Sequence, residues 1–206
     1  MAKGGSSTRW KQRQARDPYV RKARAEGFRS RAAYKLQEIQ AKDRLLARGQ
    51  VVVDLGAAPG AWCQVAAGII GPAGRILAVD LLPLEPLEGV TFIQGDFQDE
   101  SVYDDLLARA GLGGVDLVMS DLAPNMSGMR DVDQPRSMYL AELALEFAGR
   151  VLRPGGSCLV KLFQGAGFSE YVTAVRARFG TVRLRKPAAS RPENREMYLV
   201  ARDFRL

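Results

Sequence analysis

The chain has 206 residues, 47% hydrophobic and 26% charged, a composition typical of one globular domain with a sizeable core. It contains no histidine, which excludes Ser-His-Asp and Cys-His nucleophile pairs and every histidine-containing metal site. Its two cysteines, Cys63 and Cys158, are too few for a disulfide framework and favour free thiols in a reducing compartment. Any proton transfer therefore depends on Lys, Asp, Glu, Tyr or water.

No stretch is as apolar as a membrane-spanning helix, which requires about 18 consecutive apolar residues. The N-terminus is basic, but no apolar core of a secretory signal follows it. We therefore expect a cytoplasmic protein with no membrane partner.

Charge divides the chain into three parts. Residues 1–50 contain 14 Lys/Arg and 4 Asp/Glu, residues 51–150 contain 5 and 15, and residues 151–206 contain 11 and 4. The net charge of +7 thus hides two basic regions around an acidic middle. Such basic regions suit nucleic acid, because neutralised phosphates release counterions. Scattered basic residues can also form a merely solvated surface, but eleven among the first 35 residues exceed what solubility requires.

The first 50 residues are predicted to form an arm followed by basic helices. Residues 1–17 lack apolar periodicity and are expected to be disordered until bound. One folded domain is expected to span residues 18–206 and to include basic helices within 18–48. Ser30 is a good N-cap, and residues 31–46 place apolar side chains at helical spacing.

From residue 51 onwards, strand and helix patterns alternate. Strands are predicted near 51–55, 75–80, 90–94, 115–120, 156–162, 181–185 and 196–202, and helices over 61–70, 99–110, 134–152 and 168–179. The segment Pro154-Gly155-Gly156 is expected to stop a helix and turn the chain before the fifth strand. This alternation predicts a single α/β domain, with helices on both faces of a parallel sheet.

Four aspartates stand where successive predicted strands end: Asp54, Asp80, Asp96 and Asp121. Ligands of doubly wound sheets bind outside the carboxyl ends of the strands, so we expect these carboxylates to line one pocket. A tight turn, Gly56-Ala57-Ala58-Pro59-Gly60, follows the first strand and lets the backbone approach a ligand closely.

Charge favours one ligand over another at this turn. A pyrophosphate prefers a helix N-terminus and cations, and the turn is not GxGxxG, so a nicotinamide dinucleotide is disfavoured. A sulfonium ion that carries an α-ammonium group suits carboxylates, which indicates S-adenosylmethionine. Asp80 would accept hydrogen bonds from both ribose hydroxyls, and Asp96 from the adenine amino group with Phe97 beside the ring.

Several motifs resemble the FtsJ/RrmJ-type ribosomal RNA large-subunit 2′-O-methyltransferases. They are Ser30–Leu36 (SRAAYKL), Asp54–Gly60 (DLGAAPG) with Trp62, Ser120–Asn125 (SDLAPN), Val160–Gly165 (VKLFQG), and Ser190-Arg191 with Arg195–Tyr198 (REMY). The resemblance covers nearly the whole chain from about residue 18. Asn194 stands where a serine is expected, and the tail Arg202–Leu206 differs from the usual end, which bears on loop contacts with RNA rather than on the chemistry.

The resemblance implies a Rossmann-like class I methyltransferase domain, whose sheet has seven mostly parallel strands and an antiparallel last strand. It implies a catalytic tetrad of Lys35, Asp121, Lys161 and Glu196. It also implies cofactor contacts at Gly60, Trp62, Asp80, Asp96 and Asp121, to which the turn and the pocket add Gly56, Pro59 and Phe97. No metal is implied. The implied acceptor is a uridine ribose 2′-OH in the A-loop of 23S ribosomal RNA, in the assembled large subunit, and the enzyme is expected to be a monomer without an obligate protein partner.

Without histidine, a lysine is the candidate base, although an unperturbed lysine with a pKa of about 10.4 is protonated at neutral pH. A second cation disfavours the charged form and carboxylates favour it, so the sequence leaves the balance open. We hypothesise that Lys161 takes the 2′-OH proton or stabilises the alkoxide, that Lys35 and Glu196 position it, and that Asp121 bridges cofactor and substrate. The alternative is two structural salt bridges, but a lysine at the end of an apolar strand is costly unless it is paired or used.

Other readings of the chain remain open. The acceptor could be transfer RNA or an mRNA cap, although no aromatic cap pocket is identifiable. A non-catalytic RNA-binding assembly factor could lose tetrad residues without penalty, and all four are present. Tyr34 suits core packing better than base stacking, and Trp62 is either a core anchor or a cofactor contact, the resemblance favouring the contact.

Overall fold

The computed structural model of the chain describes residues 17–191 and 194–205, so the predicted arm over residues 1–16 lies outside the described residues. The helices are α2 (Pro18–Ala25), α3 (Ala32–Asp43), α4 (Ala61–Ile70), α5 (Glu100–Ala110), α6 (Arg130–Val151) and α7 (Phe168–Arg178). The strands are β1 (Val51–Leu55), β2 (Arg75–Asp80), β3 (Val90–Gln94), β4 (Val115–Ser120), β5 (Leu152–Phe163), β6 (Phe179–Arg185) and β7 (Glu196–Phe204).

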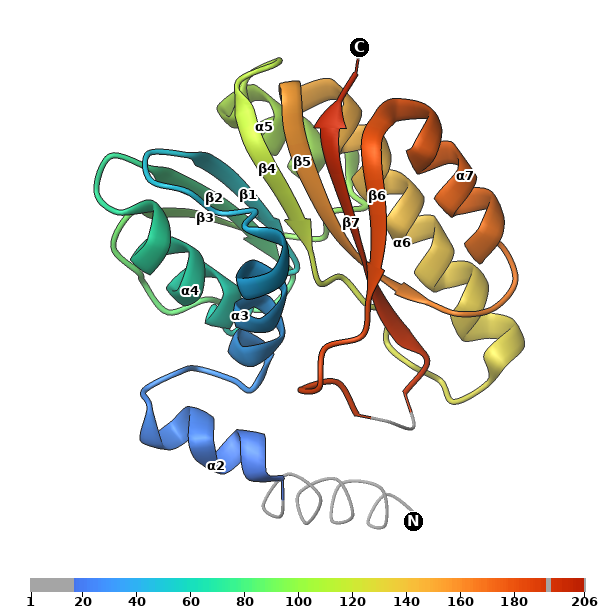
Figure 1. Cartoon of the computed structure of the whole chain (residues 1–206), viewed down its shortest axis with the longest axis horizontal. Coiled ribbons are helices and arrows are strands. Elements are labelled where there is room, and N and C mark those ends of the chain that lie inside the picture. The colour runs from blue at the N-terminus through green and yellow to red at the C-terminus, as the bar shows by residue number, and fades with distance from the viewer. Residues whose placement is uncertain (1–16, 192–193, 206) are drawn as a thin grey trace.

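The strands form one seven-stranded sheet in the order β3-β2-β1-β4-β5-β7-β6 (Figure 1). Strand β7 runs antiparallel to both of its neighbours, and the other adjacent pairs are parallel. The chain builds outward from β1 to β3 and then returns to place β4 on the other side of β1. This reversal creates a switch point, beside which ligands of doubly wound sheets bind. The expected α/β fold, with its antiparallel last strand, is confirmed.

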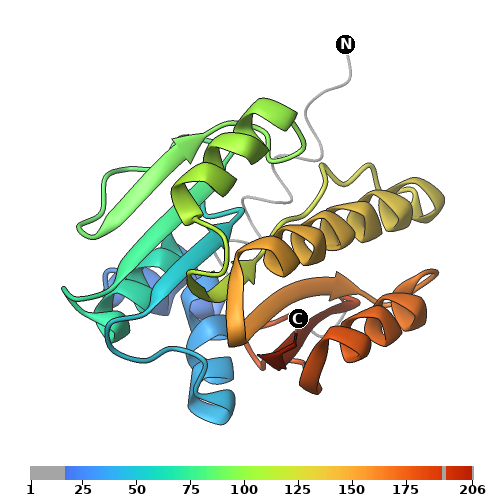
Figure 2. The same ribbon diagram turned by 90° about the horizontal axis from the view of Figure 1, so that it is seen from above.

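Helices cover both faces of the sheet (Figures 1 and 2). Along β1, the side chain of Val52 packs in a core with α3 and α4, whereas Val53 and Leu55 pack in a second core with α5, α6 and α7. Neighbouring residues of a strand point to opposite faces, so this continuously apolar strand supplies both cores at once. No helix of the described residues is long and apolar enough to span a membrane.

The N-terminal helices contact the loop that follows β6. Ala23 of α2, Tyr34 of α3 and Ala189 form a small buried cluster. The carboxylate of Glu38 accepts hydrogen bonds from the backbone N–H groups of Ala188 and Ala189, at 2.6 and 3.0 Å. Tyr34 is buried in this cluster, which agrees with the core role predicted for it.

Three boundaries differ from the sequence predictions by three or more residues. The helix predicted over 31–46 ends at Asp43, because Arg44 adopts a left-handed conformation with φ 48°. Helix α6 begins at Arg130 rather than near 134, so Pro135 lies inside it. The expected stop and turn at Pro154–Gly156 is wrong in position. The helix has already ended at Val151, and those residues form the irregular start of β5, where the pairing with β4 shifts register.

Candidate active site

The turn between β1 and α4 depends on two glycines with left-handed backbones. Gly56 has φ 81°, and a Cβ atom there would lie 3.0 Å from the backbone nitrogen of Leu122. Gly60, the N-cap of α4, has φ 105°, and a Cβ atom there would lie 2.7 Å from Nη1 of Arg29. Only glycine combines this conformation with this space, so the backbone of the turn reaches the sheet edge without side chains in the way.

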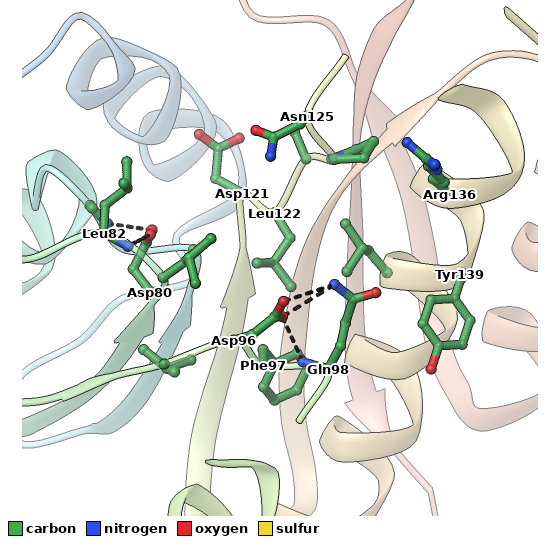
Figure 3. A pocket seen from close by; sticks show the side chains of 18 of the residues that line it. Asp80, Leu82, Asp96, Phe97, Gln98, Asp121, Leu122, Asn125, Arg136 and Tyr139 are labelled. Carbon is green, nitrogen blue, oxygen red and sulfur yellow. Dashed lines mark hydrogen bonds between the residues drawn. The ribbon is translucent and has the colours of Figure 1, made fainter. Parts of the chain in front are cut away.

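A cavity of about 890 Å³ opens beside this turn, at the carboxyl ends of β1 to β4 (Figure 3). Its lining includes five of the residues predicted to bind the cofactor: Gly56, Asp80, Asp96, Phe97 and Asp121. Leu122, Pro124 and Asn125 continue the wall beyond β4, and Arg136 and Tyr139 of α6 form the far side. Three strand-end carboxylates, separated in sequence, therefore line the same cavity.

Hydrogen bonds from the backbone orient two of these carboxylates. Asp80 accepts from the N–H groups of Ala58 and Leu82, at 2.9 and 2.8 Å. Asp96 accepts from the N–H of Gln98 at 2.9 Å, and the Gln98 amide lies against the same carboxylate (Figure 3). Each carboxylate oxygen has two lone pairs, so both groups retain acceptor capacity for a ligand.

The remaining predicted cofactor residues lie outside the cavity lining. Pro59 accepts a hydrogen bond from Nη1 of Arg29 through its carbonyl, at 3.1 Å, and Gly60 caps α4. Trp62 is buried, and its Nε1 donates to the carbonyl of Ala32 at 2.9 Å. Its ring lies 5.8 Å from that of Tyr198, measured between centroids. The side chain of Trp62 thus joins α3 to β7 in the core.

Asp54 lies behind the turn rather than in the cavity. It is fully buried one residue before the end of β1, and the thiol of Cys63 donates to its Oδ2 at 3.1 Å. Its Oδ1 has no hydrogen-bond partner. Burial raises the pKa of Asp54 to about 7, and the charges of Asp121 and Asp80 act in the same direction. The expectation that all four strand-end aspartates share one pocket is therefore wrong for Asp54. In the sheet register Asp54 pairs with Ala78 and Met119, which come two residues before Asp80 and Asp121, so its side chain points to the same face but lies deeper in the interior.

The four tetrad residues meet at the edge of this cavity. The Nζ of Lys161 lies 3.0 Å from Oδ1 of Asp121 and donates to the Asp121 carbonyl at 2.5 Å. The Nζ of Lys35 lies 2.8 Å from Oε1 of Glu196. The side chains of Lys161 and Glu196 are only 8% and 7% exposed, so both ion pairs are largely removed from water.

Tyr198 joins these two ion pairs, a role that the sequence reasoning did not assign to it. Its hydroxyl accepts from Nζ of Lys35 and donates to Oδ1 of Asp121, both at 3.0 Å. The signal was its spacing: Glu196 and Tyr198 are two residues apart on β7 and therefore share one face of the strand. Lys161 and Tyr198 are paired between β5 and β7, and both side chains contact Oδ1 of Asp121.

The charges of the cluster are balanced, with two lysines and two carboxylates. Burial alone would raise the pKa of Asp121, but the charges of Lys161 and Lys35 outweigh it and hold this pKa below its usual value. Glu196 behaves similarly, because Lys35 and its hydrogen bonds overcome the effect of burial and lower the pKa. Burial and the nearby carboxylates raise the pKa of Tyr198 well above its usual value, so its hydroxyl stays neutral.

Asp121 belongs both to the cavity and to the charged cluster. A ligand in the cavity would therefore meet a second reactant at Asp121, where Lys161 approaches from β5. Within residues 17–191 and 194–205, no group of three or more Cys, Asp or Glu side chains is arranged to hold a metal ion. The site consists of a carboxylate-lined cavity next to two lysine-carboxylate pairs.

This sheet order, with a glycine turn after β1 and an acidic cavity at the switch point, defines a Rossmann-like methyltransferase. A family model described as FtsJ-like methyltransferase matches residues 28–204, and the chain belongs to this family. Two relatives, from Pseudomonas paraeruginosa and Pseudomonas aeruginosa, are named ribosomal RNA large subunit methyltransferase E. Each is 55% identical over 205 residues, covering 100% of this chain and 99% of the relative.

Solved structures with the same fold are similar over most of the chain. A Plasmodium falciparum protein described as a ribosomal RNA methyltransferase has a TM-score of 0.73 at 28% identity, covering 86% of this chain and 98% of its own. A Clostridium thermocellum protein described as an rRNA methylase has a TM-score of 0.57 at 17% identity, covering 83% of this chain and 97% of its own. The second similarity concerns the fold alone.

Proposed function

We propose that this methyltransferase transfers a methyl group from S-adenosylmethionine to a ribose 2′-hydroxyl of large-subunit ribosomal RNA. The observation that carries the proposal is the connected row Glu196–Lys35–Tyr198–Asp121–Lys161, which ends at a carboxylate-lined cavity. The names of the two Pseudomonas relatives support the same acceptor. An acceptor of this kind implies that the protein acts in the cytoplasm, where ribosomes are assembled.

The cavity fits S-adenosylmethionine in size and charge. Its volume of about 890 Å³ lies within the 300–1,000 Å³ range of small-molecule sites. Asp80 and Asp96 would hold the ribose hydroxyls and the adenine amino group, and Asp121 would face the positively charged end. When bound, S-adenosylmethionine supplies an electrophilic methyl group on a sulfonium centre.

The remaining tasks of the protein are to position the acceptor oxygen and to remove one proton. The ammonium form of Lys161 has three N–H donors, and its two contacts with Asp121 leave one for the acceptor oxygen. In our proposal, Lys161 contacts the 2′ oxygen. As the neutral amine it takes the hydroxyl proton, and as the ammonium it stabilises the alkoxide while the proton leaves to water. Lys35, Tyr198 and Glu196 hold Asp121 and thereby Lys161 in place.

A labelled-methyl assay tests this function. The protein is incubated with labelled S-adenosylmethionine and unmodified large ribosomal subunits, with bare rRNA and transfer RNA in parallel, and the digested nucleosides are identified by mass spectrometry. We expect 2′-O-methyluridine from the subunits and none with Lys161→Ala. Methylation of transfer RNA alone would show that transfer RNA, rather than ribosomal RNA, is the acceptor. Tight cofactor binding without methyl transfer to any RNA would indicate an assembly factor.

A further inference from the structure

Several of the exposed apolar side chains lie at or next to the cavity. Among the described residues, seven large hydrophobic side chains are exposed: Leu81, Leu82, Leu112, Met126, Met129, Tyr139 and Leu184. Leu81, Leu82 and Tyr139 line the cavity, and Met126 follows directly after its lining residue Asn125. Scattered exposed apolar residues are ordinary, but a group at the mouth of one cavity indicates an interaction surface.

The two methionines are presented by a loop that is held in place. We define the methionine loop as residues 125–129, between β4 and α6. The carboxylate of Asp133 is buried and accepts hydrogen bonds from the N–H of Ser127, the Ser127 hydroxyl and the N–H of Gly128, at 2.8, 2.8 and 2.9 Å. The N–H of Met129 donates to the Ser127 hydroxyl at 3.1 Å. These bonds fix the backbone, while Met126 and Met129 remain 57% and 62% exposed.

Two arginines of α6, Arg130 and Arg136, follow the methionine loop in the mainly acidic middle of the chain. Arg130 and Arg136 are exposed, and neither forms an ion pair within the described residues. Arg130 is the first residue of α6, where the helix dipole disfavours a cation. Figure 3 shows Arg136 on the α6 side of the cavity, with Asn125 between it and Asp121. A cation at this position does not stabilise the helix, but it is well placed to bind an anion.

We propose that the methionine loop holds the RNA nucleotides that flank the acceptor ribose, with Met126 and Met129 packed against their bases and Arg130 against a phosphate. This inference rests on the proposed function. The acceptor oxygen must reach Lys161 beside Asp121, so the neighbouring nucleotides pass over the segment that follows Asp121. Thioether side chains pack well against aromatic faces, and apolar wedges separate stacked bases.

The arginines that follow the methionine loop, and the continuity of the loop with the site, favour RNA over a protein partner. The apolar surface and the unpaired arginines together match an alternation of bases and phosphates. Proteins recognise single-stranded RNA loops by packing side chains against unstacked bases, and apolar side chains beside the cavity provide such a surface. If the loop instead bound a protein partner or closed over the cofactor, the variants below would give different results.

The test replaces the methionines by residues of similar size and different polarity. We compare Met126→Gln/Met129→Gln with Met126→Leu/Met129→Leu, and use Leu112→Gln in the α5–β4 turn as the control, because Leu112 is 75% exposed away from the cavity. Methyl transfer to unmodified large subunits and S-adenosylmethionine affinity are measured for each protein. We expect kcat/KM for the RNA to fall about tenfold in the glutamine variant, the size of one lost stacking contact, with cofactor affinity unchanged. The leucine variant and the control should stay within about twofold of wild type.

Other results would overturn the inference in distinguishable ways. Equal kcat/KM in the glutamine variant and wild type would remove the loop from RNA binding while leaving the proposed function intact. A loss that follows cofactor affinity would make the loop a cofactor lid, and equal losses in the glutamine and leucine variants would assign it to shape rather than polarity. A wild-type protein that transfers no methyl group to RNA would overturn the proposed function itself.

A second variant tests the phosphate contact independently. Replacing Arg130 by Gln should reduce the slope of log K against log salt concentration for RNA binding by about one, because one fewer counterion is released. Arg109→Gln is the matched control, since Arg109 is already paired with Asp105 on the surface of α5. An unchanged slope for Arg130→Gln would overturn the phosphate contact.

Discussion

Two clusters of ion pairs join α3 to the C-terminal strands, and they differ in their cations, which are arginines in one cluster and lysines in the other. At the end of α3, the carboxylate of Asp43 receives two hydrogen bonds from Arg185, at 2.7 and 2.6 Å, and lies 3.6 Å from Arg183. Two turns earlier, Lys35 pairs with Glu196. The arginine cluster uses a planar fork on a fully buried carboxylate, whereas the lysine cluster borders a cavity.

The difference separates a structural cluster from a chemical one. A guanidinium group in a two-pronged contact has a fixed geometry and remains charged throughout the working range of pH. An ammonium group on a flexible stem retains unused donors and can exchange a proton. The Asp43 cluster therefore fastens α3 to β6, and the lysine cluster leaves Lys161 able to contact a second molecule.

The largest expected effect concerns Lys161. Replacing it by alanine should lower the rate of methyl transfer about a thousandfold, within the range of positioned acid-base groups, with S-adenosylmethionine affinity nearly unchanged. Single-turnover transfer to large subunits measures the rate, and equilibrium binding measures the affinity. Wild-type turnover in this variant would return the lysine cluster to the same structural role as the Asp43 cluster.

Removal of the Asp43 carboxylate should act on stability instead. Asp43→Ala leaves Arg185 and Arg183 without their partner, and loss of one member of a buried pair costs about 3 kcal/mol. Urea unfolding measures the loss, and methyl transfer per folded molecule should stay at the wild-type value. Asp105→Ala is the control, because its ion pair with Arg109 is exposed and is worth at most about 0.5 kcal/mol. Reduced turnover with unchanged stability would place Asp43 in the site.

A third buried carboxylate, that of Asp54, forms no ion pair with a cation of the described residues, and its effect on stability can be tested through pH. Burial raises the pKa of Asp54 to about 7, so the folded state binds its proton more tightly than the unfolded chain, whose carboxyl titrates near 3.9. Stability should therefore fall as pH rises from about 4 to 7, by about 1 kcal/mol between pH 6 and 7. Asp43 has a lowered pKa, so its contribution is instead lost as pH falls below about 4.

Unfolding of wild type and Asp54→Asn by urea at pH 5, 6, 7 and 8 checks the Asp54 prediction. The asparagine variant should lack the fall in stability that the wild type shows between pH 6 and 7. Parallel curves for the two proteins would mean that Asp54 is ionised throughout, with its charge satisfied by groups other than Cys63.

The smallest expected effect concerns Tyr198. Tyr198→Phe removes the hydroxyl that joins Lys35 to Asp121 and should lower kcat about fivefold, because the lysine-carboxylate pairs persist without their link. Tyr171→Phe is the matched control, since its buried hydroxyl donates to the carbonyl of Ala141 at 3.0 Å, away from the site. We expect a stability change in the control without a change in kcat. Equal kcat values for Tyr198→Phe and wild type would show that the two pairs act separately.

Local sequence patterns predicted most of the elements, because strand and helix periodicities are properties of short segments. The boundaries that differed depended on side-chain hydrogen bonds and on backbone conformation, which hydrophobic periodicity does not record. Helix α6 starts early because Asp133 holds the preceding loop, and the helix after Ser30 ends early at the left-handed Arg44. Neither the hydrogen bonds of Asp133 nor the left-handed conformation of Arg44 leaves a periodic signal in the sequence.

The cavity was partly predictable for a similar reason. Asp80, Asp96 and Asp121 follow strands, and the carboxyl ends of parallel strands meet at one edge, so their convergence follows from the alternation of elements. Asp54 and Trp62 belong to the motif around the glycine turn, and yet both side chains are buried in the interior. Asp54 lies deeper because its register partners, Ala78 and Met119, come two residues before Asp80 and Asp121, and a motif alone does not give this register.

The sequence by itself determined the order of strands and helices, the glycine turn, the acidic middle between basic ends, and the residue types of the site. Only the tertiary structure decided that Lys35 and Glu196, Asp121 and Lys161 form two pairs joined by Tyr198, and that the methionine loop stands at the cavity mouth. The physical reason is that composition and periodicity are local, whereas an ion pair between α3 and β7 exists only after the sheet has brought distant segments together.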